Sequence, residues 1–225
     1  MRIFCFSGYG YSAQIANYFS ARLGIPVEDI MENSQTDTAI VIFPVYCQNV
    51  PVPVIGFLRS LRAESIVLIA SYGGIHHGNA IWEAAGLNSA QVMGAAYVPT
   101  GHSFLNEEKR FDMSALEPIF ERIASPRSAV IKKEKKQLFA DLFPAWRSRT
   151  GIKIIRNTAC TDCGLCTSRC PMNAIKNGLP QGNCIRCLRC VANCPNHALS
   201  TKLTKVMKHY FAAYAVREDK TELYL

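Results

Sequence analysis

The sequence predicts a two-part chain, in which a three-layer α/β sandwich is followed by a small cysteine-rich α+β domain. Two observations carry this prediction. Short β-rich segments alternate with helical patterns over the first 105 residues, and most of the ten cysteines crowd between residues 160 and 194. The chain has 225 residues, of which 49% are hydrophobic and 19% are charged. These values fit two globular domains, each with a core of its own.

The first part is expected to form one parallel sheet. Its candidate strands are short, apolar and rich in β-branched residues, as buried parallel strands are. They cover residues 2–6, 27–31, 38–43, 65–71 and 92–98, and the segment 27–31 is the weakest. Helices are expected between them, because apolar residues recur there at helical spacing. The stripes are Ile15, Phe19 and Leu23, then Val54, Phe57, Leu58 and Leu61, then Ile81 and Trp82 within 78–90.

Residues 106–156 are expected to form a helical bridge between the two parts. Apolar residues predict one helix in it: Leu116, Ile119, Phe120 and Ile123. The lysine-rich segment 132–136 predicts a second helix with a solvated charged face, and a docking patch for an acidic partner is the alternative.

The last segment, 202–225, is expected to form a helix and a tail. The apolar face of the helix carries Leu203, Val206, Met207, Tyr210, Phe211 and Tyr214, and it is flanked by lysines. Such a face can lie on a membrane surface, but we expect it to pack on its own protein.

The crowded cysteines form an internal repeat. The first run is Cys160, Cys163, Cys166 and Cys170, and each cysteine of the second run, Cys184, Cys187, Cys190 and Cys194, lies 24 residues after its counterpart. Three thiolates two residues apart can wrap three irons of one cubane, whose fourth iron needs a ligand from elsewhere in the chain. Zinc knuckles would leave the third and fourth cysteines of each run without a role. The repeat therefore predicts two 4Fe–4S clusters.

In runs of this spacing, the fourth cysteine ligates the other cluster. The first cluster is thus expected to take Cys160, Cys163, Cys166 and Cys194, and the second to take Cys184, Cys187, Cys190 and Cys170. Residues 157–201 are expected to form this domain, which resembles bacterial-type ferredoxins without a departure in ligand spacing. The resemblance implies two low-potential clusters that serve one-electron transfer.

A turn with two glycines directly follows the first expected strand. It reads Ser7-Gly8-Tyr9-Gly10-Tyr11-Ser12 and leads into a helix, so that backbone N–H groups would face an anion such as phosphate. It is neither a Walker A loop nor a Gly-x-Gly-x-x-Gly fingerprint, since it has no Gly-Lys-Ser/Thr and no third glycine. The turn is similar to the phosphate loop of flavodoxins, Ser/Thr-x-Thr-Gly-x-Ser/Thr, in which Ser7, Gly10 and Ser12 match.

Two further loops, 44–51 and 71–77, are similar to flavodoxin loops. They follow expected strands at their carboxyl ends, where an open α/β sheet binds its ligand. The resemblance implies a flavodoxin-like domain over residues 1–105, with strand order 2-1-3-4-5, that holds FMN. The implied flavin contacts are Ser7, Gly8, Tyr9, Gly10, Tyr11, Ser12, Val45, Tyr46, Cys47, Gln48, Ser71, Tyr72, Gly73 and Gly74.

Over nearly its whole length the chain resembles single-chain fusions of a flavodoxin-like domain with a two-cluster ferredoxin from anaerobes. It departs from flavodoxins at Tyr9, which replaces a threonine, and at Tyr11, which replaces a common asparagine. The stretch 99–102 replaces the usual Pro-x-Asn-Tyr. A flavodoxin fold that docks a partner and holds no flavin therefore stays open. The lone cysteines Cys5 and Cys47 are expected to be packing residues.

Together these features predict an electron-transfer protein that relays single electrons between two 4Fe–4S clusters and FMN. An electron carrier is favoured over an enzyme with its own substrate, and redox proteins are expected as donors and acceptors. Two alternatives stay open. One is a flavin-dependent reductase of a small organic substrate, and the other is a flavin-free cluster module that feeds a partner enzyme.

The charge balance gives little support to nucleic-acid binding. The formal charge is +8. Since each cluster with its four thiolates carries about −2, the loaded protein would carry only about +4. The start of the chain lacks the pattern of a signal peptide, and no stretch approaches the ~18 apolar residues of a membrane helix. A cytoplasmic protein without a membrane span is expected.

Overall fold

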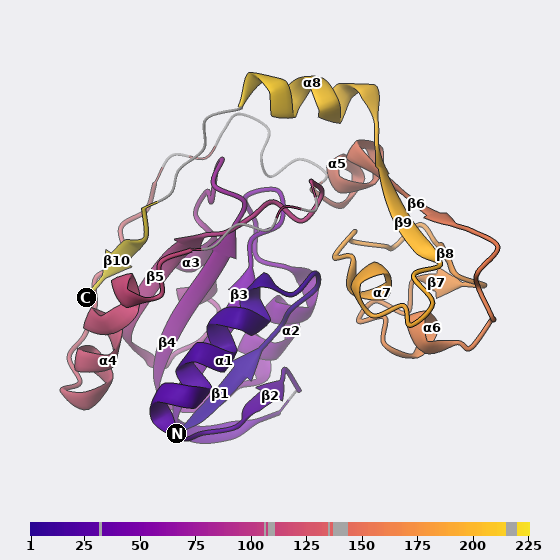
Figure 1. Cartoon of the computed structure of the whole chain (residues 1–225). Helices are drawn as coiled ribbons and strands as arrows, with labels where there is room; N and C mark the ends of the chain where they lie inside the picture. The colour runs from indigo at the N-terminus through magenta and orange to yellow at the C-terminus, as the bar shows by residue number, and fades with distance from the viewer. Residues whose placement is uncertain (32, 106, 108–110, 135, 137–143, 215–219) are drawn as a thin grey trace.

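The computed structural model describes residues 1–31, 33–105, 107, 111–134, 136, 144–214 and 220–225. In these residues a large sheet carries helices on both faces, and a small cysteine-rich lobe lies beside it (Figure 1). The sheet has six strands in the order β10-β5-β4-β3-β1-β2. The architecture is thus an α/β unit next to a smaller second unit.

Five parallel strands follow the order expected from the sequence. They are β1 (Arg2–Cys5), β2 (Val27–Asp29), β3 (Gln35–Pro44), β4 (Arg62–Tyr72) and β5 (Gln91–Pro99). Strands β3 and β4 begin earlier than expected, because their polar first residues also pair in register, Gln35 beside Arg62. The middle of β3 and of β4 is apolar and buried, which is what a sheet covered on both faces requires.

The sixth strand, β10 (Glu222–Tyr224), comes from the C-terminal end of the chain and pairs antiparallel with β5. It lies at the free edge of β5, with Leu223 opposite Ala96. The sequence suggested only a helix and a tail for this segment. Three residues are too few to show a strand pattern, so the pairing depends on the exposed edge of β5.

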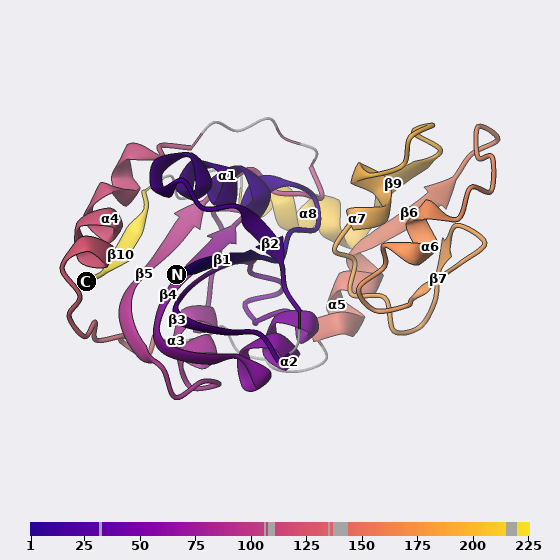
Figure 2. The same ribbon diagram turned by 90° about the horizontal axis from the view of Figure 1, so that it is seen from below.

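Two layers of helices cover the sheet (Figure 2). Helices α1 (Tyr11–Leu23) and α4 (Glu117–Ala124) pack on one face, where Phe19 and Ile119 share a core. A 3₁₀ turn, η1 (Ser114–Leu116), leads into α4. Helices α2 (Val52–Ser60) and α3 (Ala80–Ala85) pack on the other face, where the Phe57 ring lies 5.0 Å from the Phe4 ring. Both helical faces come from the apolar stripes of the sequence.

Two expectations for these helices are wrong. Helix α3 is shorter than the range 78–90, and Trp82 is 41% exposed, with Lys133 lying 4.6 Å from the centre of its ring. The lysine-rich segment forms no helix at residues 131–134 or 136, and the rest of it lies outside the described residues. Lys136 is only 10% exposed, since it pairs with Glu83 and donates to Asn49 Oδ1 at 2.9 Å. Lys136 therefore has specific partners in place of the expected solvated helix face, whereas Lys132 and Lys133 are exposed.

The cysteine-rich lobe is built on two small two-stranded sheets, of which one is a hairpin. Helix α5 (Pro144–Gly151) leads into β6 (Ile152–Arg156), which pairs antiparallel with β9 (Leu199–Leu203). Strands β7 (Ile175–Lys176) and β8 (Leu179–Pro180) form the hairpin. Strand β6 falls in the range expected for the bridge, yet its partner is a strand of the lobe.

The sequence repeat is also a repeat of structure. Helices α6 (Leu165–Ser168) and α7 (Arg189–Ala192) are equivalent in the repeat. Each starts after a residue in the left-handed conformation, Gly164 with φ 74° and Leu188 with φ 63°. A non-glycine residue in this conformation is uncommon, so the backbone of the second run is held by its surroundings.

Helix α8 (Lys205–Ala213) follows β9 and runs from the lobe toward the sheet (Figure 1). Its N-cap is Thr204, whose hydroxyl accepts a hydrogen bond from Met207 N at 3.3 Å. Phe211 is buried against His102, with ring centres 4.5 Å apart. Phe211 of the apolar face thus packs on the protein, as expected, whereas Val206 of the same face is 78% exposed. None of the helices among the described residues has the length and apolarity needed to cross a bilayer.

Candidate functional site

The first expected ligand set surrounds one cavity of the lobe. Cys160 and Cys163 lie on the loop that leads into α6, Cys166 lies in α6 itself, and Cys194 lies just after α7. All four line a cavity of about 410 Å³. Three of these thiols thus come from the first run and the fourth comes from the second.

The second expected set lies deeper in the lobe. Cys184, Cys187 and Cys190 are buried, and Cys170 packs against the same core as Cys184 and Cys190. Burial raises the pKa of Cys190 to about 12, and the thiolates of Cys187, Cys184 and Cys170 add to the rise. Burial also raises the pKa of Cys187 to about 11. Four ionised thiols in such a place repel one another, and a positive iron core would relieve that repulsion.

Backbone N–H groups support the thiols in both halves of the repeat. Ala174 N donates to Cys170 Sγ at 3.2 Å, and Ala198 N donates to Cys194 Sγ at 3.3 Å. The two bonds are equivalent in the repeat. Hydrogen bonds to cluster sulfurs stabilise the reduced form and tune the reduction potential. The lobe therefore offers two similar sulfur environments.

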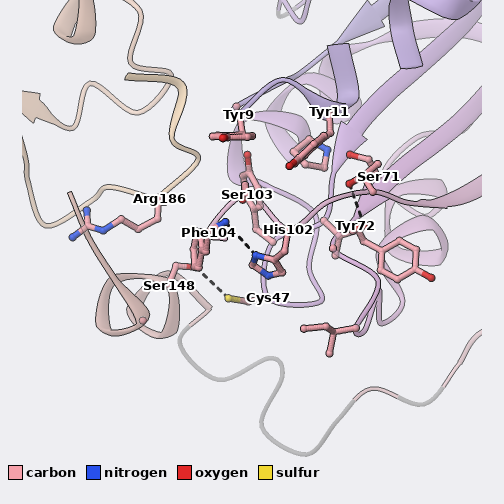
Figure 3. A pocket seen from close by; sticks show the side chains of 18 of the residues that line it. Tyr9, Tyr11, Cys47, Ser71, Tyr72, His102, Ser103, Phe104, Ser148 and Arg186 are labelled. Atoms are coloured by element: carbon pink, nitrogen blue, oxygen red, sulfur yellow. Dashed lines mark hydrogen bonds between the residues drawn. The ribbon is translucent and has the colours of Figure 1, made fainter. Parts of the chain in front are cut away.

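A second cavity, of about 500 Å³, lies where the carboxyl edge of the sheet meets the lobe (Figure 3). It has the size of ordinary cofactor pockets, which run from about 300 to 1,000 Å³. Its walls are the turn 7–12, the loops after β3, β4 and β5, and residues of α5, α8 and the lobe. All the residues expected to contact a flavin line this pocket except Gly74.

The turn 7–12 is held by its own hydroxyls. Ser7 Oγ accepts a hydrogen bond from Ala13 N at 3.3 Å, and Ser12 Oγ lies 2.8 Å from Ser71 Oγ. Gly10 has a φ of 131°, a conformation that L residues rarely adopt, and it is the N-cap of α1. The positive end of α1 therefore begins at the pocket wall, where it favours an anion.

Tyr9 and Tyr11 stand at one side of the pocket, opposite His102 and Phe104 (Figure 3). The rings of Tyr9 and Tyr11 are 5.4 Å apart, and the Tyr11 hydroxyl donates to the carbonyl of Glu107. The two tyrosines that depart from the flavodoxin pattern thus supply aromatic wall. They do not supply a short hydroxyl of the kind that a threonine gives.

The lobe contacts the turn directly. A Cβ atom at Gly8 would lie 2.1 Å from the carbonyl oxygen of Cys187 and 2.5 Å from the Tyr46 hydroxyl, so only glycine fits there. Burial, followed by the neighbouring Cys187, raises the pKa of Tyr46 well above its usual range. The turn expected to hold a phosphate is thereby in van der Waals contact with the second cysteine set.

Arg189 of α7 fastens this contact. Its Nε donates to the carbonyl of Ser7 at 2.9 Å, and its Nη1 lies 3.1 Å from Asp29 Oδ2 at the end of β2. The guanidinium also lies 5.0 Å from the centre of the Phe6 ring. Arg189, which lies between Cys187 and Cys190, therefore binds the segment just after β1 and the last residue of β2.

Sequence reasoning missed several residues of the pocket wall. They are Thr100, Gly101, His102, Ser103, Phe104, Ser148, Thr150, Gly151, Ile185, Arg186, Val206, Met207 and Tyr210. Pro44, Ile75 and His76 also line the pocket, but they belong to the two loops that the sequence indicated. The stretch after β5 could have been found, because it ends a parallel strand at the same edge as the other loops. The residues of α5, α8 and the lobe gave no such signal, since only the tertiary structure brings them to the sheet.

His102 shapes the centre of this wall. A Cβ atom at Gly73 would lie 2.4 Å from the His102 ring, and Phe104 N donates to His102 Nδ1 at 3.2 Å. Cys47 also faces the pocket, with its Sγ 3.1 Å from Ser148 Oγ, so it is more than a packing residue. Cys5 lies in the core, where burial raises the pKa of its thiol to about 12.

Comparison with known proteins identifies part of the lobe. Residues 153–176 match the family model of the 4Fe-4S binding domain. This range holds the first cysteine run, Cys160 to Cys170. No curated protein matches the chain. The protein therefore contains a ferredoxin-like iron–sulfur part that binds a 4Fe–4S cluster and has a role in electron transfer.

Proposed function

We propose that this protein relays single electrons between two 4Fe–4S clusters and one FMN. One observation carries the proposal. The pocket at the carboxyl edge of the sheet is lined by Ile185 and Arg186, which lie between Cys184 and Cys187 in the sequence. A cofactor in this pocket would therefore lie next to the second cysteine set.

The first cluster would be held by Cys160, Cys163, Cys166 and Cys194, and the second by Cys184, Cys187, Cys190 and Cys170. The all-sulfur donor sets suit iron–sulfur chemistry, and the shared cavity of the first set supports the crossed pairing. The family match covers only the first run. The second cluster is supported by the repeat, which carries the same spacing, the same short helix and the same N–H···S bond.

FMN would lie in the pocket with its phosphate at the N-terminus of α1, beside Gly10. Tyr9, His102 and Phe104 offer aromatic surface for the ring, and Met207 adds an apolar side. When bound, a flavin can hold one or two electrons, which would join one-electron clusters to a two-electron acceptor. The residues of the wall would orient the ring and keep water away from the side that faces the lobe.

The cofactor content of protein purified without oxygen tests this proposal. Two clusters and one flavin correspond to about eight irons and about eight sulfides per chain, together with one FMN. About four irons would contradict the second cluster, and iron without flavin would favour the flavin-free module. Cys47→Ser is the matched control, since it removes a thiol outside both ligand sets and should leave the iron content unchanged.

One observation favours the reductase as a second candidate. Val206 lines the pocket and yet is 78% exposed, so that the pocket wall formed by α8 is in contact with solvent. A small organic substrate could reach a flavin ring from this side. Turnover of such a substrate in the absence of any partner protein would support the reductase over the relay.

A further inference from the structure

Three ligand-type side chains from distant parts of the chain come together outside the lining of the pocket. His77 belongs to the loop after β4, Glu134 to the segment along α3, and Glu222 to the first position of β10. One ligand atom of each lies within 4.8 Å of the others. The His77 side chain is only 10% exposed, and it does not line the pocket proposed for the flavin.

The distances between these atoms are close to those of a metal site. His77 Nε2 lies 3.3 Å from Glu222 Oε2 and 3.9 Å from Glu134 Oε2. Nitrogen and oxygen ligands at about 2.0–2.2 Å from a tetrahedral zinc ion stand roughly 3.3–3.5 Å apart. The distance from His77 to Glu222 already has this value. The distance from His77 to Glu134 is longer, so the Glu134 carboxylate would have to rotate toward the ion.

The histidine ring is oriented for a ligand. Its Nδ1 lies 3.0 Å from the carbonyl oxygen of Gly78, and because a carbonyl only accepts, Nδ1 carries the hydrogen. Nε2 is therefore the atom that faces the two carboxylates. Metal-binding histidines almost always donate their other ring N–H to a carbonyl or carboxylate in this way. Stacking on Tyr97, with ring centres 3.7 Å apart, keeps the ring in place.

The carboxylates are also held from outside the cluster. The Tyr224 hydroxyl lies within hydrogen-bonding reach of Oε1 of both glutamates, 3.3 Å from that of Glu134. The Tyr224 hydroxyl has one proton, so it can donate a hydrogen bond to only one of the two carboxylates. The negative charge of the other carboxylate then needs a cation or a proton of its own. Asn79 brackets the backbone of Glu134, since its Nδ2 donates to the carbonyl at 2.6 Å and its Oδ1 accepts from Glu134 N.

We propose that His77, Glu134 and Glu222 bind a zinc ion, with water as the fourth ligand. Glu134 and Glu222 are 41% and 40% exposed, which leaves the ion a side open to water. One imidazole and two carboxylates suit zinc, and the absence of sulfur sets this site apart from the cysteine lobe. The ion fastens β10 and the segment that carries Glu134 to the loop after β4. This role is independent of the clusters and of the flavin.

The test uses the full chain with its clusters loaded, so that the thiols are occupied. The protein is equilibrated with zinc and desalted, and zinc is counted beside iron by mass spectrometry. X-ray absorption spectroscopy at the zinc edge then identifies the ligand atoms by their bond lengths. We expect one zinc per chain, with bonds at about 2.0–2.1 Å to nitrogen and oxygen and none at the ~2.3 Å of zinc–sulfur bonds.

His77→Gln and Glu222→Gln should each weaken zinc binding at least about tenfold, since loss of even a supporting residue has that effect. Glu222 is half-exposed in the edge strand β10, so the isosteric variant Glu222→Gln should fold. This variant keeps the test valid if His77→Gln fails to fold. His209→Gln on the exposed face of α8 is the control and should bind as the parent does. Zinc held by sulfur, no zinc, or equal zinc in Glu222→Gln would overturn the proposal. Ion pairing of protonated His77 with the two glutamates would then explain why the three side chains lie together.

Discussion

Gly8 and Gly10 are each required, for two different physical reasons. Gly10 is needed for its backbone, since its φ of 131° is strained for any L residue. Gly8 is needed for its lack of a side chain, because the carbonyl of Cys187 and the Tyr46 hydroxyl occupy the space of a Cβ atom. The second requirement joins the sheet to the lobe, and so it bears on the electron transfer proposed between them.

Gly8→Ala should therefore destabilise the protein. The added methyl group meets a backbone carbonyl, which cannot rotate away as a side chain can, and overpacking of this kind costs about 1–3 kcal/mol. Denaturant unfolding of the loaded protein measures the change. Gly182→Ala is the control, since a Cβ atom there meets nothing within 4 Å. Equal stability of the two variants would show that the turn and the lobe are not in contact.

The crossed ligand sets predict that cysteine variants fall into two pairs. Cys170→Ala should damage the same cluster as Cys184→Ala, although Cys170 adjoins the other loop in the sequence. Cys194→Ala should damage the same cluster as Cys160→Ala. Electron paramagnetic resonance of the reduced variants identifies the cluster that remains. If Cys170→Ala pairs with Cys160→Ala, the crossed assignment is wrong.

At the scale of elements, the short helices of the lobe depend on their surroundings more than on their own sequence. Helices α6 and α7 have only four residues each, too few for a stable helix in isolation. Helix α8 is longer and has its own cap, and it brings Met207 and Tyr210 to the pocket. Its stability should therefore influence whatever the pocket binds.

Thr204→Ala should loosen α8 and speed the loss of flavin. The variant removes the hydroxyl that accepts from Met207 N, and loss of such a cap costs about 0.5–2 kcal/mol. The rate of flavin release is followed by the recovery of flavin fluorescence, and the iron content should not change. Thr204→Ser keeps the hydroxyl and should behave as the parent. Unchanged release in Thr204→Ala would mean that α8 does not cover the bound flavin.

At the scale of the whole molecule, the lobe and the sheet share a continuous apolar core. Ile185 and Cys187 of the lobe pack with residues of β1, β3 and α2. The ion pair between Arg189 and Asp29 lies beside this core. A shared core would hold the cysteine sets and the proposed flavin pocket at a fixed separation, which a flexible linker between them would not do.

Neither NADH nor NADPH alone should reduce this protein at a useful rate, whereas dithionite or a reduced low-potential ferredoxin should. The sequence has no strand–Gly-x-Gly-x-x-Gly–helix unit for a dinucleotide, and its one phosphate turn would hold the flavin. Clusters with potentials of about −400 mV, as in many ferredoxins, lie below a nicotinamide donor.

A stopped-flow mixture of oxidised protein with excess NADH or NADPH under argon checks this prediction. Dithionite in the same buffer is the positive control, and it should bleach both the cluster and the flavin absorbance. Prompt bleaching of the flavin by NADH would contradict the relay and would favour the reductase, because flavin can accept hydride without a dinucleotide-binding fold.

The sequence by itself determined the features that depend on neighbours along the chain. The apolar runs identified the parallel strands, and the helical stripes identified both layers of helices. The cysteine spacing identified the iron–sulfur part, because ligands of one cluster must follow one another closely in a tight loop. The carboxyl ends of parallel strands meet at one edge of the sheet whatever their side chains are, and this general property also located most of the pocket.

Only the tertiary structure decided what residues distant in the chain do together. The pairing of β10 with β5, the partners of Lys136, the contact of Gly8 with Cys187 and the meeting of His77 with Glu134 and Glu222 all join distant segments. None of these leaves a periodic pattern, because each depends on one or two residues whose partners are chosen by the packing of the whole chain. Periodicity records which face of an element is buried, but it does not record what that face will meet.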